Sequence, residues 1–150
     1  MKARTGGGMT LCIALLAGIL LFIWSNSLLP AAISGSLSQW LRDLLGTVAG
    51  ETAGQSDGML RKLAHFTEFC ALGAVLGWLF AKLKKKIWVN AAICGCLAAC
   101  ADELLQHFAP GRAPRLTDVA IDTAGVLVGI GLLCLGYAIR KKKHNNTFGG

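Results

Sequence analysis

Residues 101–125 read ADELLQHFAPGRAPRLTDVAIDTAG, and the organisation of the whole chain follows from them. The stretch holds four of the eight acidic residues, together with two arginines and a histidine. Apolar runs suited to a lipid bilayer flank it on both sides. Charged side chains within such runs are costly and usually face the interior of a helix bundle. Because Pro110 and Pro114 interrupt a helix, the stretch predicts two helices joined by a tight turn.

Composition indicates a membrane protein. The chain has 150 residues, of which 54% are hydrophobic and 15% are charged, whereas soluble domains carry roughly 25% charged residues. Four apolar runs have about the ~20 residues that a bilayer core requires; they cover about residues 9–29, 59–83, 87–108 and 117–139. We therefore predict an all-α fold, a four-transmembrane-helix bundle that forms a single domain over residues 1–150.

Two further segments complete this prediction. Between the first two spans, apolar residues such as Leu37, Trp40, Leu41 and Leu44 recur at helical spacing. This pattern predicts an amphipathic interfacial helix within residues 31–50. After the fourth span, we expect residues 140–150 to form an unstructured, solvated basic tail.

The basic residues predict the orientation. Ten of the fifteen lysines and arginines lie before the first span, at the end of the second span or between it and the third, or after the fourth, in clusters next to apolar runs. The positive-inside rule then places both termini in the cytoplasm. This placement explains the net charge of +7 without nucleic acid as a partner. The six cysteines lie within apolar runs and lack C-x-x-C spacing, so we interpret them as packing residues.

The polar residues within the spans fall at one depth. A helix rises 1.5 Å per residue, so Glu68 lies about 21 Å from Lys82, Asp102 about 24 Å from Lys86, and Asp122 about 27 Å from Arg140. Each distance is counted from a predicted cytoplasmic cluster. The three carboxylates are therefore expected in one layer, in the outer third of a bilayer core about 30 Å thick. Asp118, Asp122, Gly125 and Gly129 also share one helix face.

Three motifs resemble the VanZ-like family of small bacterial membrane proteins. They are RKLAHFTEF at 61–69, DELLQHFAPGR at 102–112 and DVAIDTAG at 118–125, and FIWSNS at 22–27 is similar to the end of that family's first helix. The resemblance implies a multi-pass protein of the bacterial cytoplasmic membrane with a role in the cell envelope. It also implies a link to resistance against glycopeptide antibiotics, teicoplanin in particular.

The polar layer is compatible with several functions. One is a purely structural network of buried ion pairs. A second is a divalent cation that activates water for hydrolysis of an envelope lipid phosphate. A third is recognition of an envelope lipid, a lipid-linked cell-wall precursor or a glycopeptide by arginines at the outer surface. A fourth is proton-coupled transport, although the chain lacks an inverted repeat or a broken helix.

These readings assign roles to ten residues. The candidate catalytic residues are His65, Glu68, Asp102 and Glu103. The candidate ligand-binding residues are Lys62, Gln106, Arg112, Arg115, Asp118 and Asp122. The candidate metal ligands are His65, Glu68, Asp102 and Asp122. We expect the site to face the outer side of the membrane, with membrane lipids as partners.

Overall fold

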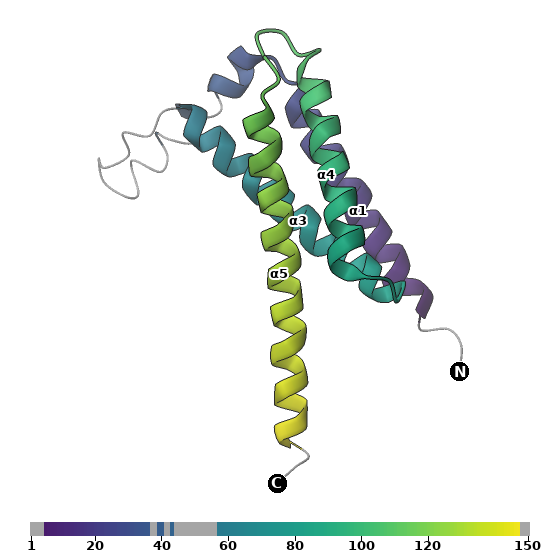
Figure 1. Cartoon of the computed structure of the whole chain (residues 1–150). Helices are drawn as coiled ribbons and strands as arrows, with labels where there is room; N and C mark the ends of the chain where they lie inside the picture. Colours follow the sequence, from purple (N-terminus) through teal and green to yellow (C-terminus); the bar gives the residue numbers. More distant parts are fainter. Residues whose placement is uncertain (1–4, 37–38, 41–42, 44–56, 148–150) are drawn as a thin grey trace.

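The computed structural model describes residues 5–36, 39–40, 43 and 57–147 (Figure 1). Most of these residues belong to four long helices: α1 (Thr5–Leu28), α3 (Asp57–Lys82), α4 (Ile87–Gln106) and α5 (Leu116–Thr147). The described residues include no strand. The expected all-α fold is confirmed.

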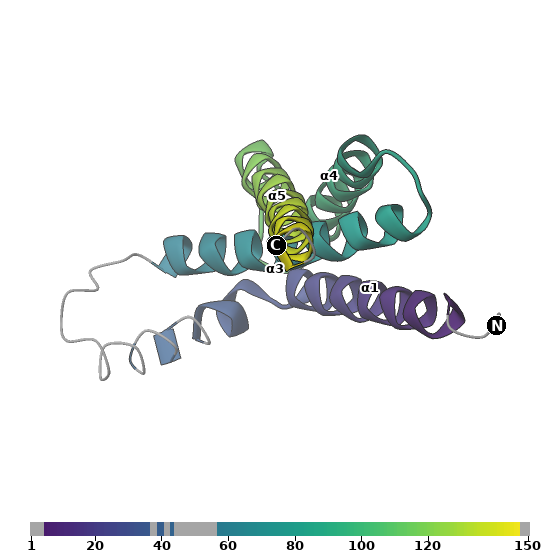
Figure 2. The ribbon, with the colours of Figure 1, turned by 90° about the horizontal axis from the view of Figure 1, so that it is seen from below.

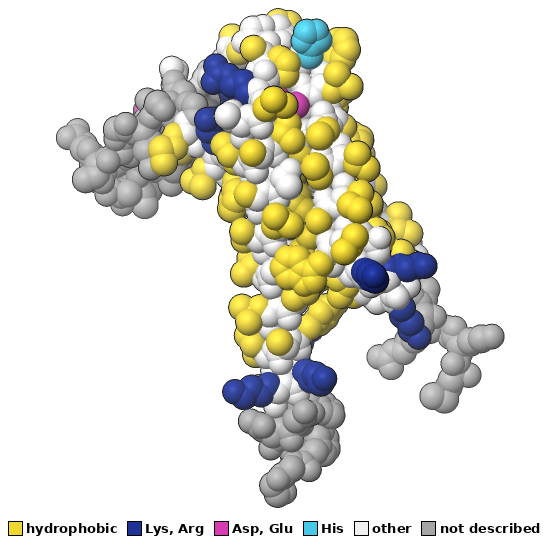
Figure 3. Space-filling model, viewed as in Figure 1, with side chains coloured by type: hydrophobic (Ala, Val, Ile, Leu, Met, Phe, Trp, Pro, Cys, Tyr) yellow, Lys and Arg dark blue, Asp and Glu magenta, His cyan; other side chains and the backbone are white. Residues whose placement is uncertain are grey.

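Each long helix contains a segment that is long and apolar enough to cross a membrane. The segments are Gly7–Leu28, Met59–Lys82, Ile87–Gln106 and Leu116–Lys142. Large apolar side chains such as Leu21, Leu97 and Leu132 are exposed on these helices, and hydrophobic side chains are spread along the helices on the face seen in Figure 3. Water disfavours so much exposed apolar surface, whereas lipid tails accommodate it. The protein is a multi-pass membrane protein.

The structure corrects or limits two expectations about the connecting segments. Residues 140–147 continue α5 as a helix, so the expected unstructured tail is wrong over that range. Lysine and arginine are good helix formers, and nothing after Ile139 breaks the helix before the two asparagines at 145–146. Within the expected helix at 31–50, residues 31–36, 39–40 and 43 are helical, and the others lie outside the described residues.

The helices run alternately up and down. The start of α1, the link at residues 83–86 and the end of α5 lie toward one end of the molecule, and the turn at residues 107–115 lies at the other (Figure 1). Helix α3 packs against α1, α4 and α5, and in the view from below it lies between α1 and α5 (Figure 2). Phe69 and Leu72 of α3 are fully buried in the core with Val126 and Ile130 of α5.

Helices α3 and α5 touch backbone to backbone. A Cβ atom added at Gly129 would overlap the carbonyl oxygen of Cys70, and one added at Gly125 would press on that of Phe66. On the opposite helix, a Cβ atom at Gly73 would overlap the carbonyl oxygen of Val126. Small residues permit this close approach within a membrane. The sequence spacing of Gly125 and Gly129 therefore marks the contact that holds the two helices together.

Gly129→Ala is expected to destabilise the protein by about 2 kcal/mol, because the added methyl group forces the two backbones apart. Gly136→Ala is the matched control, since nothing lies within 4 Å of the position its Cβ would occupy on the same helix. Alanine favours the helix there and should leave stability unchanged or slightly higher. The measurement is the thermal unfolding midpoint of the detergent-solubilised protein. Equal midpoints for the two variants would contradict this account of the contact.

Candidate functional site

Polar side chains from all four long helices meet near the end of the bundle that carries the 107–115 turn. The buried polar residues are Ser27 of α1, Asp102, Glu103 and Gln106 of α4, and Asp122 of α5. On α4, the buried face begins with the small residues Ala91, Gly95 and Ala99 and becomes polar at Asp102. The small residues that allow close helix packing are thus directly followed, on the same face of α4, by the residues of the polar layer.

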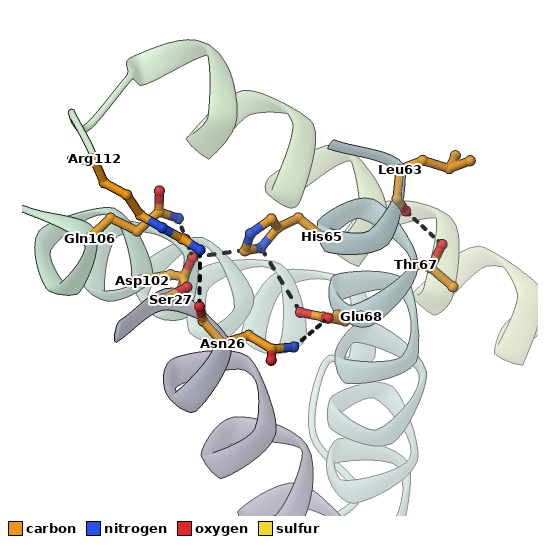
Figure 4. A network of polar contacts seen from close by, with 9 residues as sticks. All are labelled: Asn26, Ser27, Leu63, His65, Thr67, Glu68, Asp102, Gln106 and Arg112. Atoms are coloured by element: carbon orange, nitrogen blue, oxygen red, sulfur yellow. Dashed lines mark hydrogen bonds and ion pairs between the residues drawn. The ribbon is translucent and has the colours of Figure 1, made fainter. Parts of the chain in front are cut away.

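Asp102 lies at the centre of this layer and is fully buried. Ser27 Oγ donates a hydrogen bond to Asp102 Oδ1 at 2.5 Å, and Gln106 Nε2 donates one to Oδ2 at 3.0 Å. His65 Nδ1 lies 3.8 Å from Oδ2, which is too far for a hydrogen bond. Figure 4 shows these side chains converging from α1, α3 and α4. One carboxylate thus contacts side chains from three helices.

Glu68 occupies the side of the cluster nearest α1. Asn26 Nδ2 donates a hydrogen bond to Glu68 Oε1 at 3.0 Å. The other oxygen, Oε2, is buried without a hydrogen-bond partner among the described residues and lies 3.9 Å from His65 Nδ1. His65 is therefore placed between two carboxylates, those of Glu68 and Asp102 (Figure 4).

A tight turn positions Arg112. The Arg112 N–H donates to the carbonyl of Ala109 at 3.2 Å, and Gly111 has a φ of 76°. Proline followed by glycine at the two central positions, with positive φ at the glycine, is the signature of a type II turn. The Pro110 carbonyl accepts a hydrogen bond from the N–H of Ala31 at 3.1 Å, which fixes the turn against the chain just after α1.

The Arg112 guanidinium is incompletely paired. Its Nη2 donates to the carbonyl of Asn26 at 3.2 Å, whereas Nε and Nη1 are buried without a partner among the described residues. Burial lowers the pKa of Arg112, and the like charge of Arg61 lowers it further. A guanidinium remains charged in spite of such effects. Arg112 is therefore a half-buried cation with two buried donor atoms that are not used.

Three other predicted site residues lie at the edge of the cluster. Lys62 Nζ is 3.9 Å from Asp118 Oδ1, and the Lys62 side chain is 43% exposed. Glu103 is buried on α4, and its Oε2 accepts a hydrogen bond from the backbone N–H of Arg115 at 2.7 Å. The Arg115 side chain is exposed. Glu103 therefore holds the start of α5, and Arg115 contributes its backbone to the layer.

Asp122 lacks the partners that Asp102 has. Only 1% of its surface is exposed, and neither carboxylate oxygen has a hydrogen-bond partner among the described residues. Ligand atoms of His65, Asp102 and Asp122 lie within 4.8 Å of one another. A cavity of about 10 Å³ is lined by seven residues: Arg61, Lys62, His65, Gln106, Asp118, Ile121 and Asp122.

A larger cleft lies on the α1 side of the cluster. Its volume is about 290 Å³. Its polar lining consists of Asn26, Ser34, Arg61, His65, Glu68 and Arg112, and its apolar lining of Phe22, Leu29, Leu60 and Ala64. Two arginines and an apolar wall thus face one space. His65 borders both this cleft and the small cavity.

The structure brings together most of the residues predicted to form the site. His65, Glu68, Asp102, Gln106, Arg112 and Asp122 border the cluster or its two cavities. Glu68 lies outside the group formed by His65, Asp102 and Asp122. The sequence prediction missed Asn26, Ser27 and Arg61. Asn26 and Ser27 lie at the end of an apolar span, shortly before Pro30, where polar residues usually mark the membrane interface. The tripeptide SNS at 25–27 was the one sequence signal that this end of the span belongs to the site.

These features define a four-helix membrane protein whose buried acidic layer is closed by an arginine-bearing turn. The chain matches the VanZ/LLP1 family over residues 10–137. It belongs to that family, and is thus a VanZ-like membrane protein of a family linked to glycopeptide resistance. No curated protein and no solved structure gives a significant match.

Ser27→Ala is expected to destabilise the protein by about 1–3 kcal/mol, because it removes a hydrogen bond to a fully buried carboxylate. Ser25→Ala, two residues earlier on the same helix, removes an exposed hydroxyl and should change stability by less than about 0.5 kcal/mol. Thermal unfolding of the two variants in one detergent measures the difference. If Ser25→Ala were as costly as Ser27→Ala, the Asp102 hydrogen bond would not be the cause.

Proposed function

We propose that this protein binds the anionic headgroup of an envelope lipid or lipid-linked cell-wall precursor in the 290 Å³ cleft, and thereby contributes to glycopeptide tolerance. The observation that carries the proposal is Arg112, a half-buried cation in the lining of that cleft with two buried donor atoms that have no hydrogen-bond partner among the described residues. Guanidinium groups bind phosphate and carboxylate through paired hydrogen bonds. An anionic group is the ligand that this residue lacks.

Arg61 supports an anionic ligand independently. It lines the same cleft, and its charge acts unfavourably on that of Arg112. Two like charges beside a low-dielectric space repel each other more strongly than in water. An anion between them replaces that repulsion with attraction. The unpartnered Glu68 Oε2 in the same lining would accept a hydrogen bond from a hydroxyl or amide of the ligand.

The apolar wall favours a lipid over a soluble anion. Phe22, Leu29, Leu60 and Ala64 line the cleft, and Phe22 is 59% exposed on the lipid-facing surface of α1. A headgroup between the two arginines would leave its hydrocarbon chain next to these residues. Lipid-linked cell-wall precursors have this form, with a phosphate group joining a polar part to a long apolar chain.

The cleft would face the outer side of the bacterial cytoplasmic membrane. The 107–115 turn that supplies Arg112 lies at the end of the bundle opposite the 83–86 link (Figure 1). That link contains three consecutive lysines, and α5 ends in a second basic cluster. Basic clusters of this kind mark the cytoplasmic side. On the outer side, the cleft has access to the lipid-linked precursors that glycopeptides recognise.

Arg112→Gln is expected to weaken binding of a polyprenyl pyrophosphate by about tenfold or more, since it removes a charge-assisted hydrogen bond. The matched control is Arg115→Gln, because the Arg115 side chain is exposed and does not line the cleft. The measurement is microscale thermophoresis of the protein in nanodiscs, with the parent polyprenol as the uncharged probe. Equal affinity for polyprenol and its pyrophosphate in the wild type would refute headgroup recognition.

The resistance role is tested by growth. Expression of the wild-type protein in a susceptible Gram-positive host should raise the minimum inhibitory concentration of teicoplanin. Arg112→Gln should abolish most of this increase, while Arg115→Gln should retain it at equal membrane abundance. A parallel series with vancomycin shows whether the effect is specific to lipid-bearing glycopeptides. Unchanged teicoplanin susceptibility on expression of the wild type would remove the resistance role.

Hydrolysis of a lipid phosphate is the second candidate function. The observation that favours it is His65, which borders both the cleft and the small cavity beside Asp122. Water would attack the terminal phosphorus of a polyprenyl pyrophosphate, the bond from that phosphorus to the bridging oxygen would break, and the products would be inorganic phosphate and polyprenyl monophosphate. Release of inorganic phosphate from the bound polyprenyl pyrophosphate distinguishes this reaction from binding. Binding without release at any divalent-cation concentration would exclude hydrolysis of that lipid.

A further inference from the structure

Asp122 poses a problem that the proposed lipid binding does not solve. It lies outside the lining of the cleft, is almost fully buried, and has no hydrogen-bond partner for either oxygen among the described residues. Burying an ionised carboxylate without a partner is strongly unfavourable. The neighbouring His65 Nδ1 is also buried and makes no hydrogen bond among the described residues, although carboxylate oxygens of Asp102 and Glu68 lie 3.8 and 3.9 Å away. Two unsatisfied groups of this kind, side by side, indicate a missing ligand.

We propose that His65, Asp102 and Asp122 form a binding site for one divalent cation, which joins α3, α4 and α5. The site is independent of lipid binding in the cleft. Each of the three residues offers one ligand atom, and these atoms lie within 4.8 Å of one another. Metal–ligand distances of about 2.1 Å place neighbouring ligand atoms roughly 3.4 Å apart in a tetrahedral site. Closing that gap needs side-chain movements of about 1 Å.

The adjoining cavity has room for a single ion. Its volume of about 10 Å³ corresponds to about one water-sized particle. His65 and Asp122 line it together with Gln106, which also donates a hydrogen bond to Asp102 Oδ2. Gln106 thereby orients the carboxylate of Asp102, as outer-shell partners commonly do for metal ligands.

Charge balance favours a divalent ion. Neutral His65 with two carboxylates carries a charge of −2, which one divalent cation neutralises. Among the described residues, no lysine or arginine forms an ion pair with Asp102 or Asp122, and Lys62 lies closest to a different carboxylate, that of Asp118. Arg61 and Lys62 line the cavity without pairing with Asp122. The cations in the described part of the chain therefore form no direct ion pair with either carboxylate.

The donor set selects among the cations. One imidazole nitrogen and two carboxylate oxygens suit Mn²⁺ or Zn²⁺ better than Ca²⁺, which prefers oxygen ligands alone. Glu68 does not belong to the set, because the ligand atoms that all lie within 4.8 Å of one another are those of His65, Asp102 and Asp122, whereas Asn26 binds Glu68 Oε1 (Figure 4). The remaining coordination positions would be filled by water in the cavity.

The test uses the full-length protein in an uncharged detergent, stripped with EDTA and then titrated with Mn²⁺ in the absence of envelope lipid. Electron paramagnetic resonance of free Mn²⁺ measures uptake, and Mn²⁺ avoids the thiols, which bind Zn²⁺ strongly. We expect one Mn²⁺ per chain and a higher thermal unfolding midpoint when it is bound. Asp122→Asn, which has the same shape without the charge, should weaken uptake at least tenfold.

Ser25→Ala is the control, because Ser25 is exposed on α1 and that helix contributes no residue to the proposed ligand set. It should bind Mn²⁺ within about twofold of the wild type. His65→Gln provides a second ligand variant if Asp122→Asn fails to fold, as judged by gel filtration. Absence of Mn²⁺ uptake by the wild type, or equal uptake by the wild type and the folded ligand variants, would overturn the proposal. Neither result bears on headgroup binding, which the Arg112 variant tests separately.

Discussion

The buried carboxylate of Asp102 constrains the relative positions of three helices. A charge removed from water needs hydrogen bonds and opposite charge to offset the loss of hydration. Asp102 obtains hydrogen bonds from Ser27 of α1 and Gln106 of α4, and it lies next to His65 of α3. These partners are far apart in the chain, and a rotation or shift of one helix would separate them. Satisfying one side chain therefore fixes the register of the bundle.

The apolar part of the bundle makes this arrangement reachable. Backbone contact at Gly125 and Gly129 brings α5 directly against α3. Asp122 lies on the same face of α5, three residues before Gly125. A larger residue at either glycine would move Asp122 away from His65. The close approach of α3 and α5 at the small residues therefore sets the distances between the polar side chains of the acidic layer.

His65 divides the polar layer into two halves with different chemistry. On the α1 side, Glu68, Asn26 and Arg112 border an open cleft with an apolar wall, and the unsatisfied groups there are mainly cationic donors. On the α5 side, the unsatisfied groups are carboxylate oxygens of Asp122 beside a cavity of about 10 Å³. The first half suits an anion and the second a cation. A phosphate lipid and a divalent ion are complementary occupants of two such neighbouring spaces.

The sequence by itself determined the four spans, the common depth of the acidic residues and the glycine-bearing face of the fourth span, whereas the structure identified α3 as the helix that this face contacts. Apolar length, helical period and rise per residue are local properties, so they follow from the order of residues. Only the tertiary structure decided the pairings within the layer. Ser27 donates a hydrogen bond to Asp102, Asn26 donates one to Glu68, and Asp122 has no hydrogen-bond partner among the described residues. The turn at residues 109–112 directs Arg112, but not Arg115, toward the cleft. These choices depend on helix rotation and on side-chain positions within a few ångströms, which result from packing among all four helices.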